Sequence, residues 1–484
     1  MEKILKEIVD KRKITLKRKG INFGINIPKK RNVPISLPDF DKGVLICEIK
    51  RGSPSEGKMN QIKSTEEWAK KYIESGANAI SVLTEEDFFF GSLQDLIDIK
   101  NKFPNTPILR KDFLLSEKEV EISYNAGADL ILLITSVLID IDEKKSVDLL
   151  NKMKKRAEEL GMLPLIEVHN QYELEKILPL NPKLIGINSR DLKTFKINRG
   201  YPFGLKQLIS DSTYVVFESG IRNKTDAFFI GSGGFNSVLI GTSIIKSGDI
   251  KDKILDIKNG FINGINNRSS FYNRLFYKIF IEKKVVVKIC GITNIEDAEC
   301  AINNGADIIG FIFAKSPRQI KASKARDIAS KLDKDILKVA VVVDEFINEA
   351  VKAVKNGWVD AIQFQGDIED NITGNLNICW YKVIRVKDKI DFNQNYFSPI
   401  LLYDTFSKEV YGGTGKRIDD NLLEYAKSKN IDLYLAGGIN PDNVKSIISK
   451  YNPLLIDVGS GVEKSPGVKD HEKIKNLFKE LKKI

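Results

Sequence analysis

Short apolar runs rich in valine and isoleucine alternate along the chain with longer segments whose apolar residues recur at helical spacing. Such runs are typical of strands buried on both faces of a parallel sheet, with a helix after each strand. The first half of the chain has eight of these runs, which begin at Val44, Ala79, Pro107, Asp129, Met162, Leu184, Thr213 and Ser237. The second half has eight more, which begin at Val285, Asp307, Leu337, Ala361, Ile378, Ser398, Ile431 and Leu454.

Eight strand–helix units are the number that closes a parallel sheet into a (β/α)8 barrel, or TIM barrel. The two sets therefore predict an α/β protein made of two tandem (β/α)8 barrels, and the length of 484 residues favours two domains over one. An open, doubly wound sheet is the alternative. No GxGxxG sequence follows the first run of either set, which counts against a dinucleotide-binding fold.

The segments outside the two sets of runs suggest the domain boundaries. Residues 1–20 place isoleucine, leucine and valine at helical spacing among lysines, which predicts an amphipathic helix. Glycines and asparagines gather after residue 258, which indicates a partly helical linker. We expect an N-terminal barrel with its helical extension over 1–257, a linker over 258–283 and a C-terminal barrel over 284–484.

Composition excludes several classes of protein. No run of eighteen apolar residues could span a bilayer. The net charge of +11 comes from 76 basic residues interleaved with 65 acidic ones, so we expect no nucleic-acid partner but a surface that favours anionic substrates. Four cysteines without a CxxC pair, and two histidines, support neither a disulfide framework nor a zinc site. We expect a cytoplasmic protein without metal or cofactor.

The second set of runs opens with "VVVKICGIT", in which a strand ends on Cys290. In a (β/α)8 barrel the carboxyl ends of the strands face the active site, so a thiol in this place would meet the ligand. The alternative is that Cys290 is a small apolar core residue.

Glycine-rich loops follow the last two strands of both sets. The first half has ESGI at 218–221 and IGTS at 240–243, and the second half has AGGI at 436–439 and VGSG at 458–461. Glycines let backbone N–H groups approach an anion closely, and many barrels bind a substrate phosphate at this place. Ordinary turns are the alternative for any one loop, but the repetition in both halves favours phosphate binding.

Charged and polar residues collect at the ends of the strands in the first half. They are Glu48, Lys50, Lys111, Asp112, Glu167, His169, Asn188, Arg190, Glu218 and Ser219. Burying such groups is costly unless they pair, and pairing tunes pKa values for proton transfer. A solvated rim of charge is the alternative, but it does not explain why the charges fall on strand ends rather than on helices.

These motifs carry a family resemblance. "CEIKRGSPSEG", "ILRKDF", "LIEVH", "GINSRDL" and "FESGI" resemble indole-3-glycerol phosphate synthase over roughly residues 1 to 257. "VKICGIT", "FAKSPRQI", "QFQGD", "YGGTGK", "LAGGINPDNV" and "DVGSGVEKSPGVKD" resemble phosphoribosylanthranilate isomerase over roughly residues 284 to 484. The chain as a whole is similar to the bifunctional fusion of these two enzymes of tryptophan biosynthesis, and we expect a monomer that acts on small phosphorylated anthranilate–sugar substrates.

For the second half the resemblance implies an Amadori rearrangement of phosphoribosylanthranilate. Asp404 would protonate the furanose ring oxygen and Cys290 would take the proton from the sugar C2. A thiolate base needs a lowered pKa, which Lys288 or the cationic intermediate would favour. Arg318 would grip the anthranilate carboxylate. The substrate phosphate would lie at the loops of the last two strands, at Gly437, Gly438, Ser460 and Gly461.

For the first half the resemblance implies closure of the indole ring with loss of carbon dioxide and water. Lys111 would be the principal general acid and Glu167 its partner base, and Lys50 would neutralise the substrate carboxylate or share the acid role. The helix over 1–20 would cover the site. The groups that orient the substrate would be Glu48, Asn188, Arg190, Glu218 and Ser219; those that pack on its aromatic ring Phe88, Phe89 and Phe113; and those near its phosphate Ser53, Gly220, Gly241 and Thr242.

Some positions depart from the family patterns. Gln365 stands where the isomerases usually have histidine, Ile418 and Asp420 where an aromatic pair is common, and Ser189 where the synthases usually have asparagine. None of these removes a proposed acid or base. Two rival functions remain: a phosphosugar isomerase of histidine biosynthesis, which relies on paired aspartates, and a non-catalytic protein that binds phosphorylated metabolites.

Overall fold

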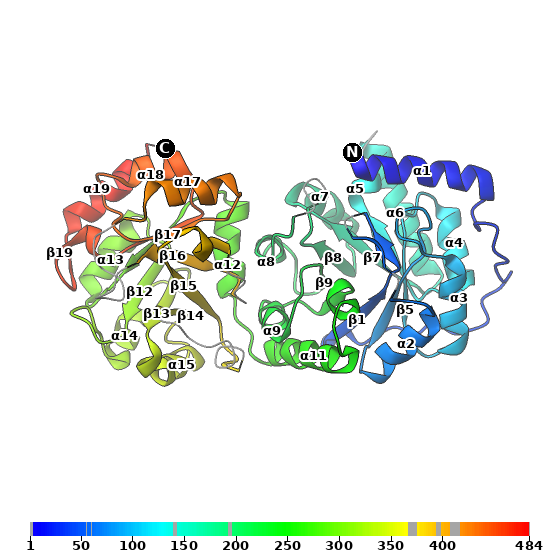
Figure 1. The fold of residues 1–484 in the computed structure, drawn as a ribbon, viewed down its shortest axis with the longest axis horizontal. Helices are drawn as coiled ribbons and strands as arrows, with labels where there is room; N and C mark the ends of the chain where they lie inside the picture. The colour runs from blue at the N-terminus through cyan, green and yellow to red at the C-terminus, as the bar shows by residue number, and fades with distance from the viewer. Residues whose placement is uncertain are drawn as a thin grey trace. The chain divides into compact units, whose positions relative to one another are not determined.

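The computed structural model describes residues 3–54, 56–59, 61–138, 143–191, 196–365, 375–393, 398–406 and 417–483. It divides into two compact units, Met1–Arg268 and Ser269–Ile484. Each unit contains a closed barrel of parallel strands with helices between them (Figure 1). The prediction of two tandem (β/α)8 barrels is therefore confirmed.

The barrel of the first unit closes because its first strand pairs with both the second and the last, from Val44 opposite Ser237 to Cys47 opposite Ile240 on the closing side. Its strands are β1 (Val44–Ile49), β4 (Ala79–Leu83), β5 (Ile108–Lys111), β6 (Leu130–Ile134), β7 (Leu163–Val168), β8 (Leu184–Asn188), β9 (Tyr214–Glu218) and β10 (Ser237–Ile240). A short hairpin, β2 (Gly52–Ser53) with β3 (Gly57–Lys58), follows β1.

Helices surround this barrel, and several begin at a side chain that accepts a hydrogen bond from a free backbone N–H. Ser64 caps the helix after β1, Asn170 the one after β7 and Asn223 the one after β9. The helices are α2 (Thr65–Glu74), α3 (Leu93–Lys102), α4 (Glu117–Ala126), α5 (Thr135–Leu138), α6 (Glu143–Glu159), α7 (Gln171–Ile177), α8 (Tyr201–Lys206), α9 (Lys224–Ser232), α10 (Thr242–Ile245) and α11 (Ile250–Asn266).

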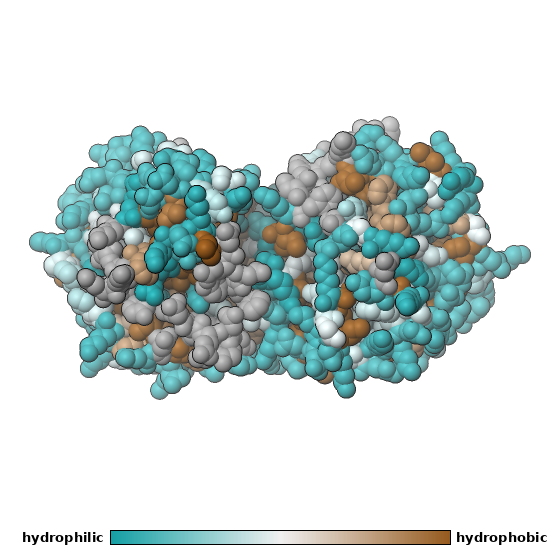
Figure 2. Space-filling model, in the orientation of Figure 1, coloured by the Kyte–Doolittle hydropathy of each residue, from teal (hydrophilic) through white to brown (hydrophobic). Residues whose placement is uncertain are grey.

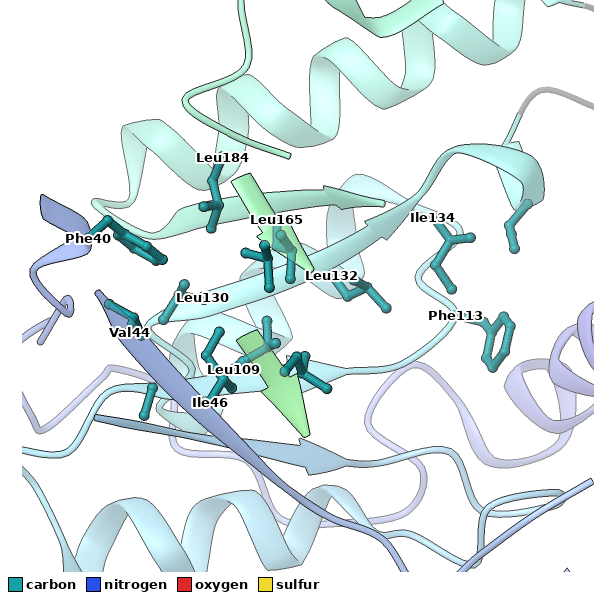
Figure 3. Packing of buried hydrophobic residues seen from close by; sticks show 14 of the residues in the cluster. Phe40, Val44, Ile46, Leu109, Phe113, Leu130, Leu132, Ile134, Leu165 and Leu184 are labelled. Carbon is teal, nitrogen blue, oxygen red and sulfur yellow. The ribbon is translucent and has the colours of Figure 1, made fainter. Parts of the chain in front are cut away.

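The interior of this barrel is filled by residues from alternate positions of the strands, because successive side chains of a strand point to opposite faces. Figure 3 shows Leu109, Leu130 and Leu165 pointing toward one another between the strands, with Phe113 and Ile134 near one end of the cluster. All of these residues are buried. The apolar packing ends at the strand ends, where the polar residues of the predicted site begin.

Helix α1 (Lys3–Lys19) precedes the barrel and corresponds to the amphipathic helix predicted over 1–20. Its residues Leu5, Ile8 and Val9 belong to the same buried cluster as the barrel interior. Burial of this apolar stripe anchors the helix, since the rest of its surface is mainly lysine and arginine.

Helices α9 and α11 of the first unit pack at glycines. A Cβ atom at Gly260 would lie 2.2 Å from the carbonyl oxygen of Lys224, and one at Gly264 would lie 2.1 Å from that of Phe228. Such distances are shorter than carbon–oxygen contact allows, so glycine is needed for this approach. The first part of the segment predicted as a linker, residues 258–266, thus lies within α11.

The barrel of the second unit has its strands in sequence order around the ring, and it closes by pairing β11 with β18. The strands are β11 (Val286–Cys290), β12 (Ile308–Ile312), β13 (Leu337–Val342), β14 (Ala361–Phe364), β15 (Trp380–Val386), β16 (Leu401–Thr405), β17 (Tyr434–Ala436) and β18 (Leu455–Val458). The helices are α12 (Phe271–Phe276), α13 (Ile295–Asn304), α14 (Ala322–Ala329), α15 (Ile347–Lys355), α17 (Asp420–Ser428), α18 (Val444–Tyr451) and α19 (His471–Leu481), and a hairpin joins β19 (Glu463–Ser465) to β20 (Val468–Lys469).

Hydrophilic residues cover most of the coloured part of the face drawn in Figure 2, and hydrophobic residues form small, separate patches there. Among the helices that the structure describes, none is both long and apolar enough to cross a membrane.

Candidate active sites

The first unit has a cavity of about 380 Å³ at the carboxyl ends of its strands. It collects nearly all the residues predicted for the synthase site. Phe88 is the exception, because it does not line the cavity but packs against the buried cluster beside it. The predicted residues that line the cavity are Glu48, Lys50, Ser53, Phe89, Lys111, Phe113, Glu167, Asn188, Arg190, Glu218, Ser219, Gly220, Gly241 and Thr242.

The charged side chains at the strand ends converge because several of them follow an inward-pointing apolar residue by two positions. Lys111 comes two residues after Leu109, and Glu167 comes two residues after Leu165. Alternation along a strand places the later residue on the same inner face, one layer nearer the strand end. The pattern that builds the core therefore also aims the charged groups into the cavity.

Lys111 forms the centre of the charged cluster in this cavity. Its Nζ donates to Glu218 Oε2 at 2.7 Å and to Glu167 Oε2 at 3.2 Å. Burial by itself lowers the pKa of Lys111, but the charges of Glu218 and Glu167 outweigh it and raise that pKa above the ordinary lysine value. Lys111 is therefore a cation at neutral pH.

The two carboxyl groups beside Lys111 differ in acidity. Burial raises the pKa of both, but for Glu167 the charge of Lys111 and a hydrogen bond to His169 prevail and hold the pKa below the usual carboxyl value. For Glu218 burial prevails, and the negative charge of Glu167 adds to it, so its pKa is raised above the usual carboxyl value. Because their environments differ, Glu167 favours the ionised form and Glu218 favours the protonated form.

His169 contacts the other carboxylate oxygen of Glu167. Its Nε2 lies 3.0 Å from Glu167 Oε1 and its Nδ1 lies 3.2 Å from Glu173 Oε2. Burial lowers the pKa of a histidine, but these two carboxylates outweigh it and raise the pKa of His169 to about 10. The ring is thus protonated at neutral pH and fixes the orientation of Glu167.

Two glycines, Gly186 of β8 and Gly241 just after β10, make room for carboxylates of the strands beside them, β9 and β1. A Cβ atom at Gly186 would lie 2.2 Å from Glu218 Oε1, and one at Gly241 would lie 2.6 Å from Glu48 Oε1. Glu48 is paired with Lys50 at 3.0 Å, so the β1 end brings its own ion pair to the cavity. Glycine is needed at both positions because any side chain would collide with a carboxylate of the cavity.

The loop after β9 turns through two consecutive residues with left-handed backbone. Ser219 and Gly220 both adopt positive φ, at 68° and 77°. Arg199 Nε donates to the carbonyl oxygen of Gly220 at 2.8 Å, and Arg222 and Lys246 also line the cavity nearby. These three cations were not among the predicted site residues, because each lies beyond the strand-end motif and looks like any other basic residue in this lysine-rich chain.

The second unit has a cavity of about 420 Å³, again at the strand ends. All the residues predicted for the isomerase site line it, namely Cys290, Arg318, Asp404, Gly437, Gly438, Ser460 and Gly461. Gln363, Gln365 and Asp457 line the same cavity. Of these, Gln365 occupies the position at which the sequence departs from the family pattern.

Asp404 is held by a chain of hydrogen bonds that joins three adjacent strands, β14, β15 and β16. Tyr381 donates to Gln363 at 2.8 Å, Gln363 to Gln365 at 3.0 Å, and Gln365 to Asp404 Oδ2 at 3.1 Å. The backbone N–H of Thr405 donates to the other oxygen of Asp404 at 2.7 Å. Burial nevertheless raises the pKa of Asp404 to about 6. Gln365 is thus a neutral donor that orients the carboxyl group.

Cys290 is in a less acidifying environment than the sequence suggested. Lys288 lies next to it and its charge does lower the thiol pKa, but burial is the larger effect and raises that pKa. Lys288 is also paired with Asp457, whose Oδ2 lies 2.6 Å from its Nζ and whose negative charge raises the thiol pKa further. Lys288 thus does favour a lower thiol pKa, as the sequence led us to expect, but its effect does not outweigh burial.

Arg318 is already engaged by a carboxylate of its own chain. Its Nε and Nη2 donate to the two oxygens of Glu463, at 2.9 and 2.8 Å. Lys469 contacts the same Glu463 at 3.1 Å, so a cation pair surrounds one buried carboxylate at the rim of the cavity. Gly291 has a φ of 80° and lies beside the Arg318 side chain. A Cβ atom at Gly291 would lie 3.1 Å from Cδ of Arg318.

The remaining departures concern packing. Ser189 donates to the carbonyl oxygen of Ser219 at 3.0 Å, so it braces the loop after β9. Ile418 is buried, and Asp420 begins α17 at the surface. The YGGTGK motif, residues 411–416, lies outside the described residues. Within the described parts of both units, no group of three or more histidine, cysteine or carboxylate side chains is arranged to hold a metal ion.

Two closed (β/α)8 barrels, each with charged residues and glycine-rich loops at its strand ends, define a tandem-barrel enzyme for small phosphorylated substrates. The family model of indole-3-glycerol phosphate synthase matches residues 5–257, and that of N-(5'-phosphoribosyl)anthranilate isomerase matches residues 287–480. The chain belongs to the family of bifunctional tryptophan biosynthesis proteins that join these two enzymes. It is accordingly a lyase and an isomerase on one chain.

Relatives with this arrangement align along most of the chain. The tryptophan biosynthesis protein TrpCF of Helicobacter pylori is 32% identical over 93% of this chain and 94% of its own length. TrpCF of Buchnera aphidicola subsp. Diuraphis noxia is 33% identical over 100% of this chain and 98% of its own length. The multifunctional tryptophan biosynthesis protein of Phycomyces blakesleeanus is 30% identical over 91% of this chain, which spans 63% of that longer protein.

Proposed function

We propose that each cavity carries out one of the two reactions with the residues assigned to it from the sequence. The C-terminal barrel converts phosphoribosylanthranilate into carboxyphenylamino-deoxyribulose phosphate, and the N-terminal barrel closes the indole ring on that ketose. The observation that supports the assignment best is the cluster of Lys111 with Glu167 and Glu218, at 3.2 and 2.7 Å, inside the first cavity.

In the synthase reaction Lys111 serves as the general acid and Glu167 as the general base. The cationic state of Lys111 supports a donor role, and the lowered pKa of Glu167 supports an acceptor role at neutral pH. Lys50 binds the substrate carboxylate that is lost as carbon dioxide. Its Nζ lies 3.0 Å from Oε1 of Glu48. Glu218, with its raised pKa, is a second proton donor beside Lys111.

Substrate binding at the synthase site divides between an aromatic wall and a phosphate end. Phe89 and Phe113, whose rings are 6.0 Å apart, provide an apolar wall for the anthranilate ring. Ser53, Gly220, Gly241 and Thr242 bind the phosphate. Asn188, Arg190 and Ser219 orient the reacting carbon chain.

In the isomerase reaction Asp404 protonates the ring oxygen of the sugar, which opens the ring to a cationic imine. The raised pKa of Asp404 supports this role, because part of the population keeps its proton near neutral pH. Cys290 then takes the C2 proton. Its thiolate is a minor form in the free protein, because burial raises the thiol pKa, and the positive charge of the imine favours that form.

Arg318 binds the anthranilate carboxylate while it keeps its contact with Glu463. The bonds to Glu463 use Nε and Nη2, so the substrate carboxylate is bound through Nη1. Gly437, Gly438, Ser460 and Gly461 bind the phosphate at the ends of β17 and β18.

Assays of both reactions on single variants test this assignment. Lys111→Ala is expected to lower ring closure by about 10²–10⁴ and to leave isomerisation unchanged, because loss of a positioned general acid costs this much. Cys290→Ala is expected to do the reverse when the ketose phosphate is supplied directly. Each variant is the folding control for the other. Ring closure by Lys111→Ala within a few-fold of the parent would show that Lys111 is structural.

Several sequence predictions remain proposals for the whole protein. We propose a monomer in the cytoplasm that uses no cofactor and binds no nucleic acid. Sedimentation at several protein concentrations tests the oligomeric state, and activity after exhaustive chelation and dialysis tests the need for a metal. A rate restored by added Mg²⁺ or Zn²⁺ would overturn the second of these proposals.

A further inference from the structure

Asp457 is a carboxylate at the wall of the isomerase cavity that the assignment above leaves without a role. It lies on β18 and is 7% exposed. Its Oδ2 accepts a hydrogen bond from Nζ of Lys288 at 2.6 Å. Its Oδ1 is also buried and has no hydrogen-bond partner within the described part of the chain.

A buried carboxylate oxygen without a partner is costly in free energy, since ionised oxygens normally keep two or more hydrogen bonds when they leave water. Asp457 lines the cavity, whereas Lys288 is fully buried beneath it and does not. The ion pair with Lys288 therefore provides a hydrogen bond to Oδ2 of Asp457 only. Among the described residues no donor reaches the other oxygen, so a molecule in the cavity can supply one.

The position of Asp457 restricts which donor this is. Lys288 pairs with Asp457 in the register between β11 and β18, and Cys290 follows Lys288 by two residues on the same inner face. A Cβ atom at Gly310 would lie 2.9 Å from Cys290 Sγ and 3.0 Å from Lys288 Cε, so both side chains lie over the same glycine. Asp457 is thus anchored by Lys288, the residue that shares the space over Gly310 with the thiol.

We propose that Oδ1 of Asp457 accepts a hydrogen bond from the C2 hydroxyl of the substrate sugar. This inference rests on the proposed function, in which Cys290 takes the proton from C2, because the hydroxyl on that carbon is then the donor nearest to the thiol. A carboxylate is an acceptor only, so it selects a hydroxyl at this place. Holding the hydroxyl on one side of C2 leaves the C2 hydrogen facing Cys290.

Two ligands that differ only at C2 test this proposal without turnover. One is the reduced product, in which C2 carries a hydroxyl, and the other is the same molecule with hydrogen in its place. The parent protein is expected to bind the hydroxyl form about 10- to 100-fold more tightly, the range for a hydrogen bond to a charged group. Titration calorimetry measures both affinities, and equal affinities would overturn the proposal before any variant is made.

The variant Asp457→Asn is expected to lose this preference. Its carbonyl oxygen would turn to Lys288 and its NH2 group would face the cavity, so a donor would replace the acceptor. If Asp457 were only structural, both ligands would weaken equally and the preference would persist, which would contradict the proposal. Asp457→Ser provides the same comparison if the asparagine variant does not fold, and it too is expected to lose the preference.

A matched control uses another buried, ion-paired aspartate of the same barrel. Asp307 lies before β12, at the opposite ends of the strands, and contacts Lys284 at 2.7 Å. Asp307→Asn is expected to lower stability but to keep the preference for the hydroxyl ligand. Cys290→Ala is also expected to keep it, so failure of the proposed base and failure of this inference give different results.

Discussion

Cys290 and Cys300 are the two cysteines with partial exposure, whereas Cys47 and Cys379 are buried. Exposure and ionisation together decide which thiol reacts, because the thiolate is the nucleophile. Burial raises the pKa of Cys290, so at neutral pH it holds less thiolate than an ordinary cysteine does. Its role in the isomerase can therefore be probed by chemical modification as a function of pH.

Iodoacetamide is expected to inactivate the isomerase slowly at pH 7 and about tenfold faster for each pH unit up to the thiol pKa, which lies above the usual value of 9. Substrate should protect, and ring closure should survive. A Cys300→Ser chain serves as control and should lose activity at the same rate as the parent. Rapid loss at pH 7 would contradict a raised pKa at Cys290.

Asp404 sets a break in the pH dependence of the isomerase. Asp404 must be protonated and Cys290 ionised, so kcat/KM rises with pH below about 6, where Asp404 keeps its proton. Above pH 6 the loss of that proton offsets the gain in thiolate, and the rate becomes level. Asp404→Asn is expected to be slower by about 10²–10⁴.

Comparison of the pH profiles of the parent and Asp404→Asn separates the titration of Asp404 from that of the substrate. The substrate phosphate also titrates near pH 6. That titration is common to both proteins, so only the break due to Asp404 should vanish in the variant. A break that remains in Asp404→Asn would assign it to the phosphate.

Among the elements, α1 fixes the synthase cavity at two places. Its buried Arg12 donates to Glu119 at 2.9 Å and lies 3.1 Å from Asp112, the residue after Lys111. Thr15 donates to Asp87 at 2.9 Å, in the loop after β4. The same helix supplies Ile4, Leu5 and Ile8 to the cavity wall. It thus joins the loops after β4 and β5 to the cavity wall.

Arg12→Met is expected to destabilise the first unit by about 3–5 kcal/mol, because it leaves two buried carboxylates with one cation fewer. Ring closure should fall and isomerisation should not, and Arg12→Lys should restore part of the loss. Thermal unfolding and the two assays measure this. Lys6→Met is the matched control on the same helix, since Lys6 pairs with Asp10 at the surface. Equal effects of the two substitutions would contradict the role of Arg12.

The number of strands and the charged strand ends that line the cavities were predictable, because continuous apolar runs are visible in the sequence and end where charged residues begin. Arg12 was not, since it lies among Lys11, Lys13 and other basic residues of one helix and only the fold shows that it is buried. Asp457 was not either, because its importance depends on the pairing of β18 with β11, far away in the sequence. The pattern of apolar and charged residues does not show which charged residues contact each other in the folded protein.

For the whole molecule, the sequence predicts domains of 1–257 and 284–484 joined by a linker, and these bounds remain a proposal. Gly260 and Gly264, which indicate a linker by composition, lie in the structure where α11 packs on α9. On the other side, Tyr272 of α12 is buried and its hydroxyl donates to the carbonyl oxygen of Trp380. Both ends of the segment 258–283 therefore contribute to the cores of the units that they adjoin.

We expect the place of a cut to decide whether the halves fold. Chains 1–268 and 269–484 keep α11 and α12, and each should unfold cooperatively and retain its own reaction. Chains 1–257 and 284–484 lose Phe261 and Phe271, which are 1% exposed; loss of such a buried ring costs about 3–5 kcal/mol. Circular dichroism on heating and the two assays compare the pairs. If the shorter pair were as stable and as active as the longer one, α11 and α12 would belong to a linker and not to the barrels.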